Sequence, residues 1–359
     1  MYGTSALFAK RASGRLSTAA PGHAGGSLVS LAEFGTNPGA LTAKVHLPDG
    51  LTPGAALVVV LHGCTQTAQG YDDGAGWSQL ADECGFAVLY PEQTRGNNPN
   101  LCFNWFQSAD TARGSGEAAS IRYMIARMVE THALDPARVF ITGLSAGGAM
   151  TAAMLAAYPD VFASGAIIAG LPSGSAASVP EALQAMRRAS AGARVAAASD
   201  HAGRWPSISV WHGDADRTVD RSNADAIVDQ WRDVHGVVGN GITDRVDGHA
   251  RTVWHDAEGR AMIESVTIAD MGHGVPLAPD HDDPIGSVGA YMLDHGISST
   301  RHIAQFWGLA REVSASATSP EKAVAPNASP IVKPRRIVPP PTGPAKIIED
   351  ALRAAGLMR

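Results

Sequence analysis

The chain has 359 residues, of which 45% are hydrophobic and 17% are charged, and its formal net charge is −6. This composition is ample for a sizeable core, in one large α/β domain with additions or in two domains. The net negative charge and the lack of a Lys/Arg stripe outside the C-terminal tail argue against nucleic acid as a partner. Because the apolar runs are too short to cross a bilayer, no membrane partner is expected either.

Residues 1–35 are rich in Gly, Ser and Ala and are predicted to form a loosely ordered lead-in. Lys10, Arg11 and Arg15 are not followed by an apolar stretch of seven or more residues, so the sequence does not support a secretory signal. We therefore expect a cytoplasmic protein, with secretion as the alternative if a leader has already been removed.

Strand-like and helix-like segments alternate between residues 36 and 312, which we predict to be the catalytic domain. Unbroken apolar or β-branched runs predict buried strands, and apolar residues at helical spacing predict helices. The predicted strands are 56–61, 86–90, 139–142, 163–168 and 208–211, the helices are 121–129, 149–157 and 224–234, and a hairpin (252–254 with 262–268) precedes a final helix capped by Ser299. This alternation predicts a mostly parallel central sheet with helices on both faces.

The C-terminal part of the chain changes in composition. Residues 313–344 are rich in Pro, Ser and Ala and are predicted to be a linker. Residues 345–359 have the apolar spacing of a short amphipathic helix, which we expect to pack on the body or on another subunit. A homo-oligomer is therefore compatible with the sequence.

The segment Gly143-Leu144-Ser145-Ala146-Gly147 fits G-x-S-x-G and lies between a predicted strand and a predicted helix. That order is typical of the nucleophile elbow of the α/β-hydrolase fold. A serine hydroxyl attacks an ester only when it projects from a sharp turn, and the glycines let neighbouring backbone pass close to it. The alternative is a Gly/Ser turn without chemistry.

A serine nucleophile requires a general base, which in this fold comes late in the chain. His273 lies in the loop directly after the strand that ends at 268 and is our candidate base. His281 is a weaker rival. His249 and His255 belong to the predicted hairpin and are interpreted as surface residues.

The acid that orients the base should follow a strand between the serine and the histidine. Asp216 lies in the middle of the loop after strand 208–211 and is our candidate. Asp214 and Asp220 are alternatives, and each could instead cap the next helix. The acid would fix the tautomer of His273 and stabilise the imidazolium without accepting the proton.

Two backbone N–H groups should form the oxyanion hole. One is that of Ala146, directly after the serine. The other is assigned to Cys64, because Gly63 in the loop after strand 56–61 allows a tight approach of the backbone. His62 is interpreted as a structural residue. No glycine-rich nucleotide motif follows a strand and no Cys/His spacing suggests zinc, so we expect no cofactor and no metal.

Cys64, Cys84 and Cys102 are the three cysteines, too few for a disulfide scaffold. Cys64 and Cys102 are expected in loops at the same edge of the sheet. Both a single bridge between them and two reduced cysteines are compatible with the sequence.

Seven short stretches resemble the polyhydroxybutyrate depolymerase-like esterase family of the α/β-hydrolases. They are residues 61–68, 90–93, 104–106, 143–148, 158–160, 212–219 and 272–273, and they extend over about residues 40–310. The resemblance implies Ser145, Asp216 and His273 as the catalytic triad. It also places Asn104-Trp105-Phe106 near the substrate cleft, where we expect Trp105, Thr65 and Asn104 to contact substrate; ordinary core packing of Trp105 is the alternative.

The resemblance implies a serine carboxylesterase that acts on short-acyl or hydroxyalkanoate esters, of the polyhydroxybutyrate oligomer type, through an acyl-enzyme. Feruloyl and acetylxylan esterases share the family and are the enzymatic alternative. A catalytically silent binding protein with the hydrolase fold is the alternative from another class. The expected partner is a small or oligomeric ester.

Overall fold

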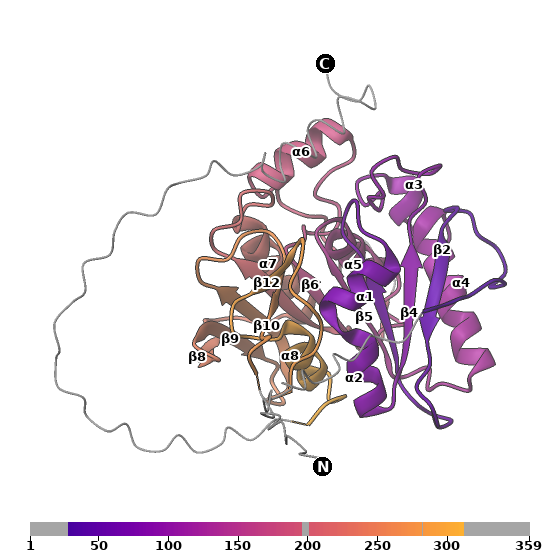
Figure 1. Cartoon of the computed structure of the whole chain (residues 1–359). Helices are drawn as coiled ribbons and strands as arrows, with labels where there is room; N and C mark the ends of the chain where they lie inside the picture. The colour runs from indigo at the N-terminus through magenta and orange to yellow at the C-terminus, as the bar shows by residue number, and fades with distance from the viewer. Residues whose placement is uncertain (1–27, 196–200, 282, 312–359) are drawn as a thin grey trace, which may run out of the picture.

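The computed structural model describes residues 28–195, 201–281 and 283–311. Its main sheet consists of β1 (Val29–Ser30), β2 (Thr42–His46), β3 (Leu57–Leu61), β4 (Ala87–Glu92), β5 (Val139–Leu144), β6 (Ser164–Ile168), β7 (Ser207–Gly213), β8 (Ile242–Val246), β9 (His249–His255) and β10 (Ala261–Ile268). The strand order is β1-β2-β4-β3-β5-β6-β7-β10-β9-β8 (Figure 1). The strands from β4 to β10 in this order pair in parallel, and those at both edges pair antiparallel.

Helices cover both faces of this sheet. They are α1 (Ala68–Ala75), α2 (Trp77–Cys84), α3 (Ser108–Thr111), α4 (Gly116–Thr131), α5 (Ala146–Ala157), α6 (Val179–Arg187), α7 (Ser222–His235) and α8 (Ser299–Phe306). A small parallel pair, β11 (Val275–Leu277) with β12 (Met292–Asp294), lies apart from the main sheet.

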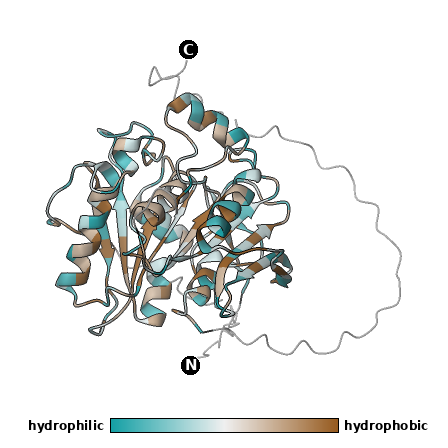
Figure 2. Ribbon diagram, turned by 180° about the vertical axis from the view of Figure 1, so that it is seen from behind, coloured by the Kyte–Doolittle hydropathy of each residue, from teal (hydrophilic) through white to brown (hydrophobic). Residues whose placement is uncertain are grey.

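The core is divided by the sheet, because successive side chains of a strand point to opposite faces. Leu57 and Val59 of β3 belong to a cluster with apolar residues of α4, α5 and α7. Val58 and Val60 belong to a second cluster with residues of α1, α2 and α8. Figure 2 shows apolar residues concentrated on the strands, with more polar residues on the outward sides of the helices. The predicted α/β-hydrolase fold is confirmed.

The five central parallel pairings bring the carboxyl ends of β3, β5, β7 and β10 to one edge of the sheet. The loops after these strands therefore gather at one place, as expected for an open α/β sheet that carries a site at this edge.

The final helix differs in one detail from its prediction. The side chain of Ser298, and not that of Ser299, accepts the backbone N–H of Arg301 at 3.4 Å and caps α8. The hydroxyl of Ser299 instead donates to the carbonyl of Pro276.

The predicted linker 313–344 and C-terminal helix 345–359 lie outside the described residues, as does most of the lead-in 1–35. In the described part of the chain, no helix combines the length and apolar character needed to span a membrane.

Candidate active site

Ser145 forms the turn between β5 and α5 with φ 57° and ψ −116°. This left-handed conformation is uncommon for a residue with a side chain and is maintained only when the surrounding structure enforces it. Here the N–H of Ser145 donates to the carbonyl of Ile168 in β6 at 2.9 Å. Ser145 is 6% exposed and lines the pocket at the carboxyl edge of the sheet.

The glycines of the motif are required by close backbone packing. A Cβ on Gly147 would lie 2.3 Å from the carbonyl oxygen of Leu61. A Cβ on Gly143 would lie 2.4 Å from the carbonyl oxygen of Gly147. Neither backbone can move without displacing β3, β5 or α5, so both positions exclude any side chain.

Asp216 and His273 meet although 57 residues separate them in the chain. The Nδ1 atom of His273 lies 2.7 Å from Oδ2 of Asp216. The other carboxylate oxygen accepts the backbone N–H groups of Thr218 at 2.8 Å and Val219 at 3.0 Å. Burial raises the pKa of Asp216, but the hydrogen bond and charge of His273 outweigh burial, and the pKa lies below its usual value. The carboxylate is therefore ionised and aimed at the histidine ring.

The two rival acids have other partners. Asp214 accepts the backbone N–H of Asp270 at 2.7 Å. Asp220 accepts the backbone N–H of Ser222 at 3.0 Å, at the start of α7. Of the three candidate acids, only Asp216 has a hydrogen bond to His273 among the described residues.

Position in the fold separates the candidate base His273 from its rival His281 and from the two hairpin histidines. His273 lines the pocket that holds Ser145, whereas His249, His255 and His281 do not. The Nε2 atom of His273 has no hydrogen-bond partner among the described residues, so it is available for proton transfer. In the same part of the chain, no group of His, Cys, Asp and Glu side chains is arranged to hold a metal ion.

The two candidate oxyanion donors lie on the same pocket. Neither the N–H of Cys64 nor that of Ala146 has an acceptor within the described residues. By contrast, the neighbouring N–H of Gly63 is used by the side chain of Gln66 at 2.8 Å. The adjacent Thr65 has a left-handed φ of 65° and donates its N–H to the carbonyl of Asn100 at 2.7 Å, which fixes the course of the loop.

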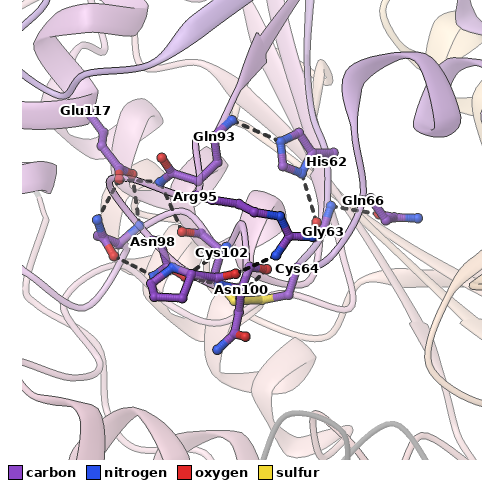
Figure 3. Close-up of a disulfide and its surroundings, with 12 residues drawn as sticks. His62, Gly63, Cys64, Gln66, Gln93, Arg95, Asn98, Asn100, Cys102 and Glu117 are labelled. Carbon is purple, nitrogen blue, oxygen red and sulfur yellow. Dashed lines mark hydrogen bonds between the residues drawn. A yellow bond between two sulfur atoms is a disulfide. The ribbon is translucent and has the colours of Figure 1, made fainter. Parts of the chain in front are cut away.

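A disulfide joins Cys64 to Cys102. It links the loop after β3 to the segment after β4, and both cysteines line the pocket (Figure 3). Of the two states compatible with the sequence, bridged or reduced, the structure has Cys64 and Cys102 bridged. Cys84 is a free cysteine.

The pocket has two chemically different walls. One contains the disulfide, Thr65, Asn98 and Asn100. The other is apolar and consists mainly of α6, with Val179, Ala182, Leu183 and Met186, together with Leu171, Val219 and Trp105, which packs against the cluster that includes Leu171 and Val219. Such a cavity, mostly apolar with a few polar groups, is typical of a small-molecule site.

Helix α6 was missed in the sequence, although a signal for it exists. The side chain of Ser178 accepts the N–H of Glu181, and the carboxylate of Glu181 reaches back to the N–H of Ala177. Pro180 lies in the first turn. A serine followed three residues later by glutamate, with proline at the start, is a recognised helix beginning.

The three predicted substrate contacts differ in position. Thr65 and Trp105 line the pocket, and their contact with substrate stays a prediction. Asn104 does not: it is 4% exposed and lies behind the wall, where its amide donates to the carboxylate of Glu117 at 2.8 Å. The expected substrate contact of Asn104 is therefore corrected to a supporting position, because a buried carboxylate satisfies its side chain.

His212 is a further residue close to the acid that the sequence did not single out. His212 is buried. Its Nε2 atom lies 2.9 Å from the carbonyl oxygen of Val219 and 3.6 Å from Oδ2 of Asp216. Burial lowers the pKa of His212, which keeps the ring neutral. It therefore fixes the loop that presents Asp216.

Comparisons with known proteins show which family the chain belongs to. The family model described as esterase PHB depolymerase matches residues 41–254. The chain is 43% identical over 292 residues to poly(3-hydroxyalkanoate) depolymerase C of Paucimonas lemoignei, covering 79% of this chain and 70% of that protein. It is 30% identical to acetylxylan esterase A of Aspergillus oryzae, covering 72% of this chain and 87% of that one. The solved acetyl xylan esterase from Aspergillus awamori superposes with a TM-score of 0.66 at 24% identity, covering 79% of this chain and all of that chain.

Proposed function

Because the chain belongs to the esterase PHB depolymerase family, it is a hydrolase of ester bonds, and we propose that it cleaves them through an acyl-enzyme on Ser145. The observation that carries this proposal is the strained Ser145, which lines one pocket with His273 while Asp216 holds the far side of that histidine. A serine triad requires a nucleophile, a base and an acid, and the shared pocket together with the hydrogen bond of Asp216 to His273 supports these three roles.

In the acylation step, Oγ of Ser145 attacks the ester carbonyl and its proton passes to Nε2 of His273. The N–H groups of Cys64 and Ala146 bind the oxyanion, and being unpaired they need not break another bond first. His273 then protonates the leaving alcohol, and the acyl group remains on Ser145.

In the deacylation step, water replaces the alcohol. His273 takes a proton from the water, whose oxygen attacks the acyl carbonyl. The second tetrahedral intermediate expels Ser145, which regains its proton from His273. Asp216 stays ionised throughout and stabilises the imidazolium.

The proposed substrates are short-acyl and oligomeric hydroxyalkanoate esters. The identity of 43% to a poly(3-hydroxyalkanoate) depolymerase supports this class. The apolar α6 wall supports it too, because a methyl-bearing acyl chain buries well against Leu183 and Met186.

A second candidate is a feruloyl or acetylxylan esterase. It is favoured by 30% identity to acetylxylan esterase A and to feruloyl esterase B of Talaromyces funiculosus. A panel of 3-hydroxybutyrate trimer, methyl ferulate and acetylated xylan separates the two candidates, since each substrate class releases a different acid.

For the place of action, we propose a compartment in which disulfides persist. The bridge between Cys64 and Cys102 favours this over the cytoplasm expected from the N-terminus, because cytosolic thiols are normally kept reduced. Thiol trapping of protein isolated from its own cells measures the fraction that is bridged; a fully reduced pool would contradict the proposal.

The nucleophile is tested by Ser145→Ala, assayed beside the wild type on p-nitrophenyl acetate, butyrate and octanoate. We expect wild-type activity that falls with acyl length and a loss of at least about 10⁴-fold in kcat for the variant. The variant should unfold at the wild-type temperature, because only an Oγ atom is removed. Substantial residual turnover in folded variant would rule out Ser145 as the nucleophile.

A further inference from the structure

Glu117 is a fully buried carboxyl group in the first turn of α4, and the mechanism above does not use it. Its two oxygens accept four hydrogen bonds: the backbone N–H of Asn104 at 2.8 Å, and the side-chain amides of Asn104 at 2.8 Å, Gln93 at 2.6 Å and Asn97 at 3.0 Å. Such a buried group is costly unless it is fully paired. The hydrogen-bond partners of Glu117 therefore indicate which part of the structure its carboxylate stabilises.

One branch of these contacts reaches the polar wall of the pocket. Gln93 donates from the same amide nitrogen to Glu117 and to the carbonyl of Cys102, at 3.0 Å for the latter. The side-chain oxygen of Asn104 accepts the amide of Asn98 at 2.9 Å. Both Cys102 and Asn98 line the pocket, so Glu117 holds this wall from behind.

The other branch reaches the loop that presents the oxyanion donor. The backbone N–H of Gln93 donates to Nε2 of His62 at 3.1 Å, and Nδ1 of His62 lies 2.8 Å from the carbonyl of Gly63 (Figure 3). Burial lowers the pKa of His62, so the ring is neutral and its proton is on Nδ1. This carbonyl belongs to the same peptide group as the N–H of Cys64, so the ring of His62 fixes the orientation of the candidate oxyanion donor.

We propose that Glu117 is a positioning residue of the active site: its carboxylate holds the disulfide-bonded wall and the loop after β3 in one arrangement. It contacts no substrate and acts through Asn104 and Gln93. The inference rests on the proposed function, because it assumes that the N–H of Cys64 and this wall bind the ester.

The charge of Glu117 matters to this network. Burial raises the pKa of Glu117 to about 8. The hydrogen bonds from the backbone of Asn104 and from the side chains of Gln93 and Asn97 oppose this rise, whereas the charge of Asp110 of α3 adds to it. The donors from the loop after β4 are neutral amides. All four partners donate N–H groups, so a proton on the carboxyl group finds no acceptor among them unless a side-chain amide turns over, which costs one of the four bonds. Loss of that proton completes the network.

The test is Glu117→Gln, with KM and kcat for p-nitrophenyl butyrate measured from pH 6 to 9. In the wild type, KM should fall as the pH rises through about 8, because the ionised Glu117 then accepts all four hydrogen bonds and fixes the polar wall of the pocket. The variant should resemble the wild type at pH 6 and show a KM roughly tenfold higher at pH 9, since small misplacements of binding groups carry costs of this order. A variant profile that superposes on that of the wild type overturns the inference.

Glu264→Gln is the matched control. Glu264 is 4% exposed, burial raises its pKa, and it accepts the hydroxyl of Ser209 at 2.6 Å on β7, away from the pocket lining. If loss of a buried carboxylate acted only through the fold, both variants would change KM alike, and this result also overturns the inference. We expect the control to keep the wild-type pH profile.

Asn97→Ala keeps the inference testable if Glu117→Gln does not fold. It removes one donor from the carboxylate while leaving the pocket lining intact. The transition in KM should move to higher pH, and an unmoved transition contradicts the inference. Ser145→Ala serves as the blank: residual turnover there defeats the proposed function, whereas an unchanged Glu117→Gln profile defeats only the role of Glu117.

Discussion

At the scale of single residues, three hydrogen bonds fix the orientation of the Asp216 carboxylate. Thr218 and Val219 hold one oxygen, and His273 holds the other. An amide at this position would present an N–H₂ group to one of these donors. It would also favour the wrong tautomer of the histidine.

We therefore expect Asp216→Asn to lower kcat by about 10³–10⁴-fold while the protein stays folded. Asp214→Asn is the matched control, since its carboxylate accepts only the backbone N–H of Asp270 among the described residues and lies in the same loop. Steady-state kinetics on p-nitrophenyl acetate measure both. A larger loss from Asp214→Asn would reassign the acid.

Residue positions could be predicted from the sequence where a strand end determines them. Ser145, Asp216 and His273 each follow a parallel strand, so periodicity alone places them at one edge. Asn104 could not be placed in this way. Whether its side chain faces substrate or the interior depends on Glu117, which lies thirteen residues later on a helix with no sequence signal for a buried carboxylate.

At the scale of elements, α6 decides the shape of the apolar half of the pocket. Its buried Ala182 and half-buried Leu183 and Met186 face the cavity, while Gln184 is exposed. The small Ala182 leaves room, and the two larger side chains, Leu183 and Met186, limit the depth of the cavity on this side.

Met186→Trp should fill this part of the cavity and lower kcat/KM for p-nitrophenyl octanoate by at least about tenfold relative to p-nitrophenyl acetate. The reason is steric, because overpacking costs about 1–3 kcal/mol. Gln184→Trp, on the exposed side of the same helix, should leave the ratio unchanged. Kinetics on the acyl series measure both variants. Equal ratios in the two variants would show that α6 does not bind the acyl group.

The sequence predicted the long elements well and the short ones poorly. Buried strands such as β3 and β5 contain short runs of apolar and β-branched residues, which favour a buried strand over a helix. Helix α6 has nine residues with two buried, so its apolar periodicity is too brief to detect. The edge strands β1 and β8 are exposed and lack a buried pattern altogether.

At the scale of the whole molecule, the disulfide closes a loop with a sequence separation of 38 that includes α1, α2 and β4. A bridge over such a loop restricts the unfolded chain and stabilises the folded one. It also fastens the polar wall of the pocket to the oxyanion loop.

Replacing both Cys64 and Cys102 with Ser should lower the free energy of unfolding by about 3–4 kcal/mol, as expected for a loop of this length. Cys84→Ser is the control, since Cys84 is free and half-buried and should cost less than about 1 kcal/mol. Urea denaturation measures both. Equal stabilities of the two variants would show that the bridge does not stabilise the fold.

The two unlike walls of the pocket differ in how readily they accept amino-acid substitutions. The reacting atoms and the polar wall are tied to the sheet by glycine packing, a covalent bridge and a buried carboxylate, so they tolerate little alteration. The apolar wall is mainly one short helix, and the side chains of α6 share no hydrogen bond with Ser145, Asp216 or His273 among the described residues. Substitutions in α6 can therefore reshape this wall while the groups of the proposed chemistry stay in place.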